Sequence, residues 1–115
     1  MQRRPSVLVV DDDLAIREVV SEVLRDEGYE VTCAADGLQA MDAMRRAPQP
    51  DLVLLDLMMP VMSGWEVLEE VHENSELSRV PIVVVSAMTA PGGHEHLAKP
   101  IDLDRLLATV GRLTR

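Results

Sequence analysis

Val53-Leu54-Leu55-Asp56-Leu57-Met58-Met59-Pro60 is the stretch from which the fold of this chain can be worked out. The branched apolar run from Leu52 to Leu55 predicts a strand that is buried on both faces of a sheet. Asp56 places a carboxylate at the end of this strand, and Pro60 prevents the strand from continuing. Because a charge at the end of a buried strand is costly unless it is paired, we expect another part of the chain to supply a partner for Asp56.

Three further segments show the same arrangement of an apolar run followed by polar side chains. Val7 to Val10 is followed by Asp11-Asp12-Asp13, and Ile82 to Val85 is followed by Ser86. A weaker strand leads to Lys99-Pro100. Polar groups at the ends of several strands are typical of a site at the carboxyl edge of a parallel sheet.

Segments of helical periodicity lie between these strands. One follows the Asp triplet and is expected to end at Gly28, and the others are expected to begin after Asp36, Ser63 and Asp102. Tyr29 to Ala34 is partly polar and predicts a short strand at a sheet edge. This alternation predicts a parallel sheet with helices on both faces.

The connection between Ser86 and the last expected strand, His94 to Ala98, breaks the alternation. It contains Ala87-Met88-Thr89-Ala90-Pro91-Gly92-Gly93. A parallel crossover usually takes a dozen or more residues and includes a helix. We therefore expect the helix of this crossover to be missing or reduced to a turn.

Composition limits the class of protein. With 115 residues, the chain is expected to form one domain over residues 1–115, without an output domain. The net charge of −9 argues against nucleic-acid binding by this domain. The apolar run Ser6–Val10 is too short for an export signal or a membrane span, so a cytoplasmic location without membrane contact is expected. Cys33 is the single cysteine and is expected to be an inert core thiol.

The expected site combines acidic and basic groups. Asp11, Asp12 and Asp56 would repel one another unless a cation or a proton is present. Oxygen ligands of this kind favour Mg²⁺. Lys99 could neutralise a phosphoryl oxygen, and the hydroxyl of Ser86 could donate a hydrogen bond to another. Together these groups favour phosphoryl transfer onto a carboxylate.

These motifs resemble the receiver domain of two-component response regulators, the CheY-like family. The resemblance rests on four stretches in the same order, which span nearly the whole chain: Val9-Val10-Asp11-Asp12, Asp56 to Pro60 with Ser63-Gly64, Val84-Val85-Ser86-Ala87, and Lys99-Pro100. It implies a flavodoxin-like, doubly wound five-stranded parallel sheet with strand order 2-1-3-4-5.

The resemblance also implies roles for single residues. Asp56 would accept the phosphoryl group from a histidine kinase or phosphotransfer protein. Mg²⁺ would be held by Asp12, Asp56 and the backbone carbonyl of Met58, with Asp11 acting mostly through water. Ser86 and Lys99 would contact the phosphoryl oxygens, with a cis Lys99-Pro100 bond. Such a domain is not an enzyme beyond its own phosphorylation and dephosphorylation, and it signals through altered contacts with a downstream protein.

Departures from the family pattern leave alternatives open. His96 stands where the family has a switch aromatic, and the helix of the crossover is missing. These two features favour a pseudo-receiver, an interaction module whose output is independent of phosphorylation. The Asp triplet also resembles the DxD motif of haloacid-dehalogenase-type phosphatases, but Asp102 and Asp104 are poor substitutes for that family's later metal ligands. A metal site formed by His94, Glu95 and His96 is not favoured, because no further ligands lie nearby in the sequence.

Overall fold

A computed structural model describes residues 4–87 and 92–115 of the chain. Five strands form one parallel sheet in the order β2-β1-β3-β4-β5. This confirms the expected order and the edge position of the second strand. The strands are β1 (Ser6–Val10), β2 (Glu30–Ala34), β3 (Leu52–Asp56), β4 (Ile82–Ser86) and β5 (Glu95–Ala98).

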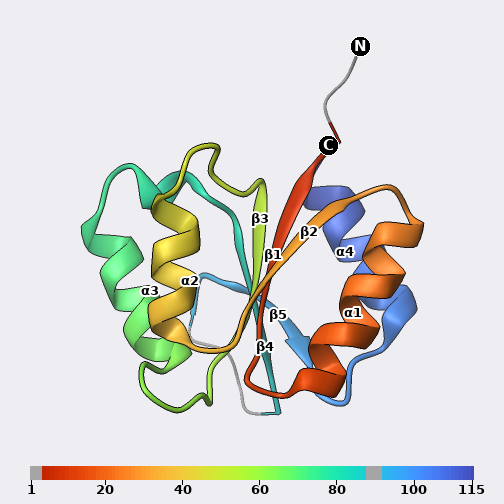
Figure 1. Cartoon of the computed structure of the whole chain (residues 1–115), viewed down its shortest axis with the longest axis horizontal. Helices are drawn as coiled ribbons and strands as arrows, with labels where there is room; N and C mark the ends of the chain where they lie inside the picture. Colours follow the sequence, from red (N-terminus) through yellow and green to blue (C-terminus); the bar gives the residue numbers. More distant parts are fainter. Residues whose placement is uncertain (1–3, 88–91) are drawn as a thin grey trace.

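Four α-helices cover the two faces of the sheet. Figure 1 shows α1 (Leu14–Asp26) and α4 (Leu103–Leu113) on one face and α2 (Gly37–Arg45) and α3 (Gly64–Glu73) on the other. A single 3₁₀ turn, Leu77–Arg79, precedes β4. The helices are therefore layered as the alternation of strands and helical segments predicts.

Side-chain caps fix where these helices begin. The carboxylate of Asp13 accepts hydrogen bonds from the backbone N–H groups of Ala15 and Ile16. Ser63 and Glu66 form a reciprocal capping box at the start of α3. Asp36 and Asp102 cap α2 and α4 in the same way as Asp13. Three of the four helices thus begin at the carboxyl edge on an aspartate, which holds the loops of this edge in place.

The strands are buried on both faces and divide the interior into two cores. In β1, Leu8 and Val10 pack into the core beneath α2 and α3, whereas Val7 and Val9 pack into the core beneath α1 and α4. The residues of β3 and β4 are all buried. This continuous burial explains why their sequences are apolar runs and not alternating patterns.

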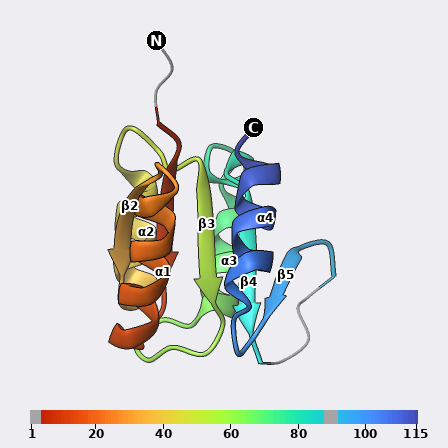
Figure 2. The same cartoon turned by 90° about the vertical axis from the view of Figure 1, so that its right-hand side faces the viewer.

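The connection between β4 and β5 has eight residues, 87–94. In the part of the chain that the structure describes, no helix lies between these strands, as expected from the sequence. Met88 to Pro91 lie outside the described residues. Figure 2 shows β5 at the edge of the sheet, next to β4 and α4.

Cys33 does not lie where the sequence predicts it. Cys33 is exposed, so the expectation of a core thiol is wrong. Its strand, β2, is one of the two edge strands of the sheet, and its sulfur lies 3.1 Å from the hydroxyl of Ser21. Among the described residues no helix is both long enough and apolar enough to span a bilayer.

Candidate functional site

Three carboxylates converge at the carboxyl edge of the sheet. Because Val10 and Leu55 are partners in the parallel pairing of β1 and β3, the next residues of both strands, Asp11 and Asp56, are neighbours. Carboxylate oxygens of Asp11, Asp12 and Asp56 all lie within 4.8 Å of one another. Asp11 and Asp56 are buried, and Asp12 is exposed. The sheet thus brings together the acidic residues that the sequence singled out.

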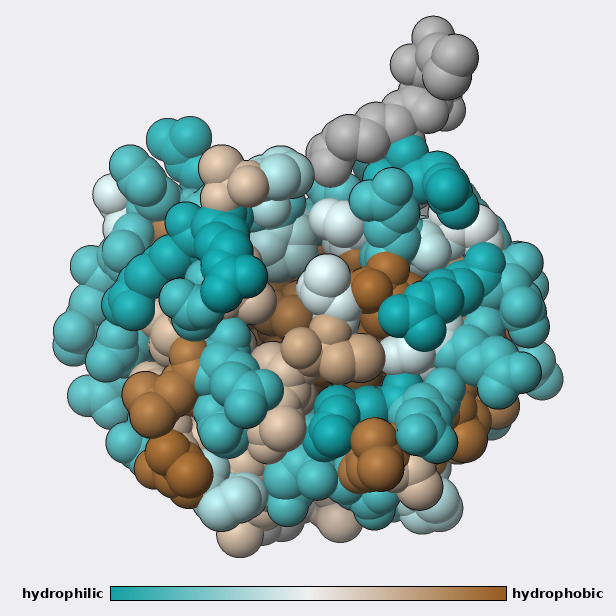
Figure 3. Space-filling view, viewed as in Figure 1, coloured by the Kyte–Doolittle hydropathy of each residue, from teal (hydrophilic) through white to brown (hydrophobic). Residues whose placement is uncertain are grey.

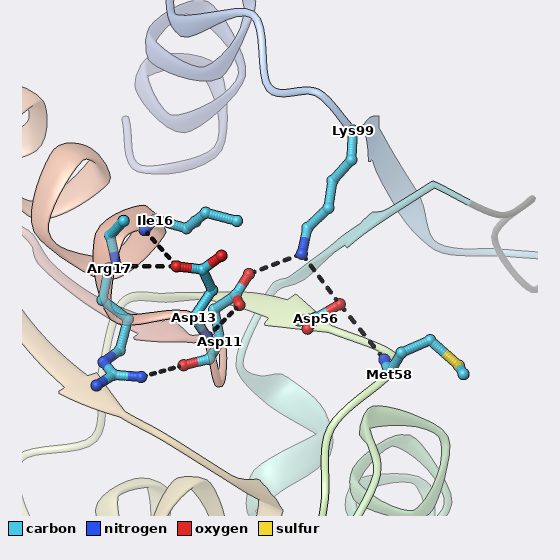
Figure 4. Close-up of polar contacts among 8 residues, drawn as sticks. Asp11, Asp13, Ile16, Arg17, Asp56, Met58 and Lys99 are labelled. Carbon is cyan, nitrogen blue, oxygen red and sulfur yellow. Dashed lines mark hydrogen bonds and ion pairs between the residues drawn. The ribbon is translucent and has the colours of Figure 1, made fainter.

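Lys99 supplies the positive charge of the cluster. Its ammonium group donates a hydrogen bond to Oδ2 of Asp11 at 2.9 Å and lies 3.4 Å from Oδ1 of Asp56. Figure 4 shows the Lys99 side chain reaching from the end of β5 to the space between the two carboxylates. The partner that Asp56 requires is therefore a lysine 43 positions later in the chain.

Burial and charge shift the acid–base properties of this pair. Burial, together with the neighbouring charge of Asp11, raises the pKa of Asp56 despite the opposing effect of Lys99. For Lys99, burial alone would lower the pKa, but the hydrogen bond and charge of Asp11 and the charge of Asp56 outweigh it and raise the pKa. The carboxylates thus favour the charged form of Lys99, while burial disfavours the charged form of Asp56.

Arg17 is a part of the site that sequence reasoning missed. The sequence places it on the polar face of the first helix, but its guanidinium donates a hydrogen bond of 2.6 Å to the backbone carbonyl of Asp11. The N–H of Asp13 donates to Oδ1 of Asp11 at 2.9 Å. These contacts, visible in Figure 4, hold the loop between β1 and α1 in one conformation. No pattern in the sequence distinguishes Arg17 from a solvent-exposed helix residue.

The loop between β3 and α3 closes tightly around Asp56. The N–H of Met58 lies 3.3 Å from Oδ1 of Asp56, while the Met58 side chain is exposed. A Cβ atom on Gly64 would lie 2.2 Å from the carbonyl oxygen of Asp56 and 2.7 Å from Cα of Leu57. The glycine of the Ser63-Gly64 motif is therefore required by the close approach of α3 to the end of β3.

Ser86 and His96 connect the site to the last strand. Ser86 is buried at the end of β4, and its carbonyl oxygen accepts a hydrogen bond from the N–H of Lys99 at 3.1 Å. Nε2 of His96 lies 3.2 Å from the same carbonyl oxygen. The Lys99-Pro100 bond is cis, as the resemblance implies. His96 is exposed on β5, and the residue at the position of the family's switch aromatic therefore contacts the backbone of Ser86.

The donor set fits a hard divalent cation. Carboxylate oxygens are the ligands preferred by Mg²⁺, which usually takes one or two carboxylates and keeps several waters. The exposed Asp12 leaves one side of the cluster open to solvent. Burial, followed by the charge of Asp11, raises the pKa of Asp56 although Lys99 opposes both effects. A cation at this position would favour the ionised form of Asp56.

Comparisons with known proteins agree with this geometry. A family model described as the response regulator receiver domain matches residues 7–111. The DNA-binding dual master transcriptional regulator RpaA of Synechocystis is 33% identical over 96% of this chain and 49% of its own length. The two-component response regulator ORR11 of Oryza sativa is 32% identical over 92% of this chain and 80% of its own length.

A solved structure gives the same result for the fold. The chemotaxis response regulator CheY4 of Vibrio cholerae superposes with a TM-score of 0.87 at 36% identity, covering 96% of this chain and 99% of that one. The chain spans about half the length of RpaA and most of the length of CheY4 and ORR11. Its relatives thus include both short proteins and longer ones with additional sequence.

Proposed function

The chain belongs to the response regulator receiver domain family, and we propose that it works as a phosphoreceiver in which Asp56 accepts a phosphoryl group from a histidine kinase or phosphotransfer protein. The observation that carries this proposal is the position of Asp56, which is buried at the end of β3 beside Asp11 and the ammonium group of Lys99. An aspartate that only ends a strand would not need a buried second carboxylate and a lysine beside it.

The transfer requires a carboxylate nucleophile and charge compensation. An oxygen of ionised Asp56 attacks the phosphorus of a phosphohistidine, an O–P bond forms, and the P–N bond breaks with its electron pair remaining on the imidazole nitrogen. The N–H of Met58 and the ammonium group of Lys99, both near Oδ1 of Asp56, hold the carboxylate in one orientation. Lys99 and Ser86 would then stabilise the charge on the phosphoryl oxygens.

We place Mg²⁺ at the acidic cluster. Asp12, Asp56 and the backbone carbonyl of Met58 would bind the ion directly, and Asp11 would act mostly through water. The bound ion would supply charge neutralisation for the incoming phosphoryl group. The dependence of this site on the ion is testable without phosphorylation, since Mg²⁺ should raise the melting temperature of the wild-type protein but not that of Asp12→Ala. Asp26→Ala, an exposed aspartate at the far end of α1, is the matched control.

The phosphodonor is a protein, and the surroundings of the site suit a protein partner. Large apolar side chains are exposed in the loops and helix starts on the side of the sheet that carries the acidic cluster: Leu14, Leu38, Met58, Val61 and Trp65. Figure 3 shows apolar patches over the lower part of this face, on the side where the strands end in Figure 1. An apolar groove lies next to Lys99, lined by α1 residues and by Pro100 and Ile101.

The experiment that tests the proposal is intact mass spectrometry after incubation with acetyl phosphate and Mg²⁺. We expect one phosphoryl adduct on the wild-type protein and none on Asp56→Asn. Asp51→Asn, at the other end of β3, should be phosphorylated like the wild type.

The pseudo-receiver is the alternative, and the connection without a helix between β4 and β5 in the described residues favours it. Beryllofluoride mimics the phosphoryl group and distinguishes the two proposals. A change in Trp65 fluorescence with beryllofluoride and Mg²⁺ supports the phosphoreceiver, because Trp65 follows Gly64, which packs against the backbone of Asp56. Absence of both the adduct and the fluorescence change would favour the pseudo-receiver.

A further inference from the structure

His72 and His94 meet on the surface that faces away from the acidic cluster. His72 lies in the last turn of α3, and His94 directly precedes β5. Their Nε2 atoms are 3.3 Å apart, and the ring centroids are 5.3 Å apart at an interplanar angle of 70°. Two residues that are 22 positions apart therefore point the same ring nitrogen at each other.

The separation of the two nitrogens allows one ring to donate a hydrogen bond to the other when no metal ion is bound. Two imidazole ligands of one tetrahedral metal ion, each at about 2.0–2.1 Å from it, have nitrogens about 3.3–3.4 Å apart and ring centroids about 5.2 Å apart. The observed distances, 3.3 Å between the nitrogens and 5.3 Å between the centroids, also fit two ligands of one metal ion.

We propose that His72 and His94 are the two protein ligands of a Zn²⁺ site that joins the end of α3 to the start of β5. Imidazole nitrogens suit Zn²⁺, Cu²⁺ and Ni²⁺ and do not suit Mg²⁺, so this site would not compete with the acidic cluster for its ion. The roughly tetrahedral separation selects Zn²⁺ among these metals.

The surroundings of the histidine pair favour a cation. The C-terminal end of a helix carries partial negative charge, and His72 lies in the last turn of α3 beside Glu73. Glu95 follows His94 in the chain. Its carboxylate forms an ion pair of 3.0 Å with Arg112 of α4, which neutralises its charge.

Water completes the coordination. Among residues 4–87 and 92–115, no third Cys, His or carboxylate joins the two nitrogens within 4.8 Å. His72 and His94 line an open groove of about 290 Å³, which also includes Ser78 and Gly93 and has room for water ligands. A closed structural zinc site has four protein ligands. With only two, this site would link α3 to the start of β5 and leave the remaining coordination positions to water.

Such a link has a specific place in this fold. The connection between β4 and β5 is short, and its described part contains no helix to pack against α3. A metal ion held by His72 and His94 would fasten this connection to α3 from the outside. Binding of Zn²⁺ to the folded state alone would also raise the stability of the protein.

The test is calorimetric titration of the untagged protein with Zn²⁺ in the presence of excess Mg²⁺, the ion proposed for the acidic cluster. We expect one Zn²⁺ per chain, and a loss of affinity of at least about tenfold in His72→Gln and in His94→Gln, since each variant removes one of two protein ligands. His96→Gln is the matched control and should bind Zn²⁺ like the wild type, because its ring contacts Ser86 instead.

Histidine side-chain NMR identifies the ligands directly. Zn²⁺ should shift the ring nitrogen resonances of His72 and His94 and leave those of His96 unchanged. The proposal is overturned if no Zn²⁺ binds once Mg²⁺ is in excess, or if His72→Gln and His94→Gln bind it as tightly as the wild type. Neither result depends on phosphorylation of Asp56, so failure here leaves the proposed function intact.

Discussion

The ammonium group of Lys99 lies 2.9 Å from Oδ2 of Asp11, which joins the end of the last strand to the end of the first. The same ammonium group is 3.4 Å from Asp56, so it is shared between two buried carboxylates. One lysine therefore neutralises part of a charge cluster that is contributed by β1 and β3. This arrangement keeps a cation within reach of any phosphoryl group on Asp56.

Replacing Lys99 by methionine should destabilise the protein when Mg²⁺ is absent. The substitution leaves Asp11 and Asp56 buried without their cation, and we expect a loss of about 2 kcal/mol in the free energy of unfolding at neutral pH. Urea denaturation with EDTA measures this difference. Lys99→Arg keeps the charge and should lose less, and a Lys99→Met protein as stable as the wild type would contradict the pairing.

Asp56→Asn should be more stable than the wild type at neutral pH without Mg²⁺. The pKa of Asp56 is raised by burial and by Asp11, so between its ordinary value of 3.8 and its raised value the folded state holds more protons than the unfolded state. The free energy of unfolding of the wild type therefore falls as pH rises through this window. We expect a difference on the order of 1–2 kcal/mol above the window, the scale of a poorly compensated buried charge.

The measurement is urea denaturation of both proteins at a series of pH values with EDTA. The stability advantage of Asp56→Asn should disappear at the acidic end, where the wild-type carboxyl group is protonated. A constant difference over the whole range would mean that ionisation of Asp56 does not cost stability. Added Mg²⁺ should reduce the difference at neutral pH, because the cation stabilises the wild type more.

Gly64→Ala should destabilise the protein by at least about 2 kcal/mol, the scale of overpacking against atoms that cannot move freely. The added Cβ would lie 2.2 Å from the backbone carbonyl oxygen of Asp56, and backbone atoms cannot turn away as a flexible side chain can. Gly92→Ala is the matched control, because no atom lies within 4 Å of a Cβ at that position. Equal urea midpoints for the two variants would contradict the close approach of α3 to β3.

The grouping of polar residues at the strand ends could be predicted from the sequence, whereas the contacts between helices and loops could not. Asp11, Asp56, Ser86 and Lys99 each follow an apolar run, and parallel strands bring their carboxyl ends to one edge, so the topology alone groups these residues. The short crossover was also predictable, because Pro91, Gly92 and Gly93 leave no room for a helix.

Arg17 and the pair of His72 and His94 depend on the packing of elements that are distant in sequence. The contact of Arg17 with the carbonyl of Asp11 requires the exact direction in which α1 leaves β1. The two histidines meet because α3 ends where β5 begins, which periodicity does not specify. The position of Cys33 beside Ala34 favours a core thiol, but in the edge strand β2 both Thr32 and Cys33 are exposed.

His96 should respond when the phosphorylation site is occupied. Its Nε2 atom lies 3.2 Å from the carbonyl oxygen of Ser86, and the hydroxyl of Ser86 is expected to turn toward a phosphoryl oxygen. A movement of Ser86 would change the hydrogen bond to His96 and carry the signal to the exposed edge strand β5. We therefore expect Mg²⁺ with beryllofluoride to shift the ring resonances of His96 in NMR spectra of the wild type and not in those of Asp56→Asn. Ser86→Ala keeps the carbonyl but lacks the hydroxyl, so the shift should shrink in this variant. If Trp65 fluorescence reports binding while His96 stays unchanged, then β5 is not coupled to the site and the output surface lies elsewhere.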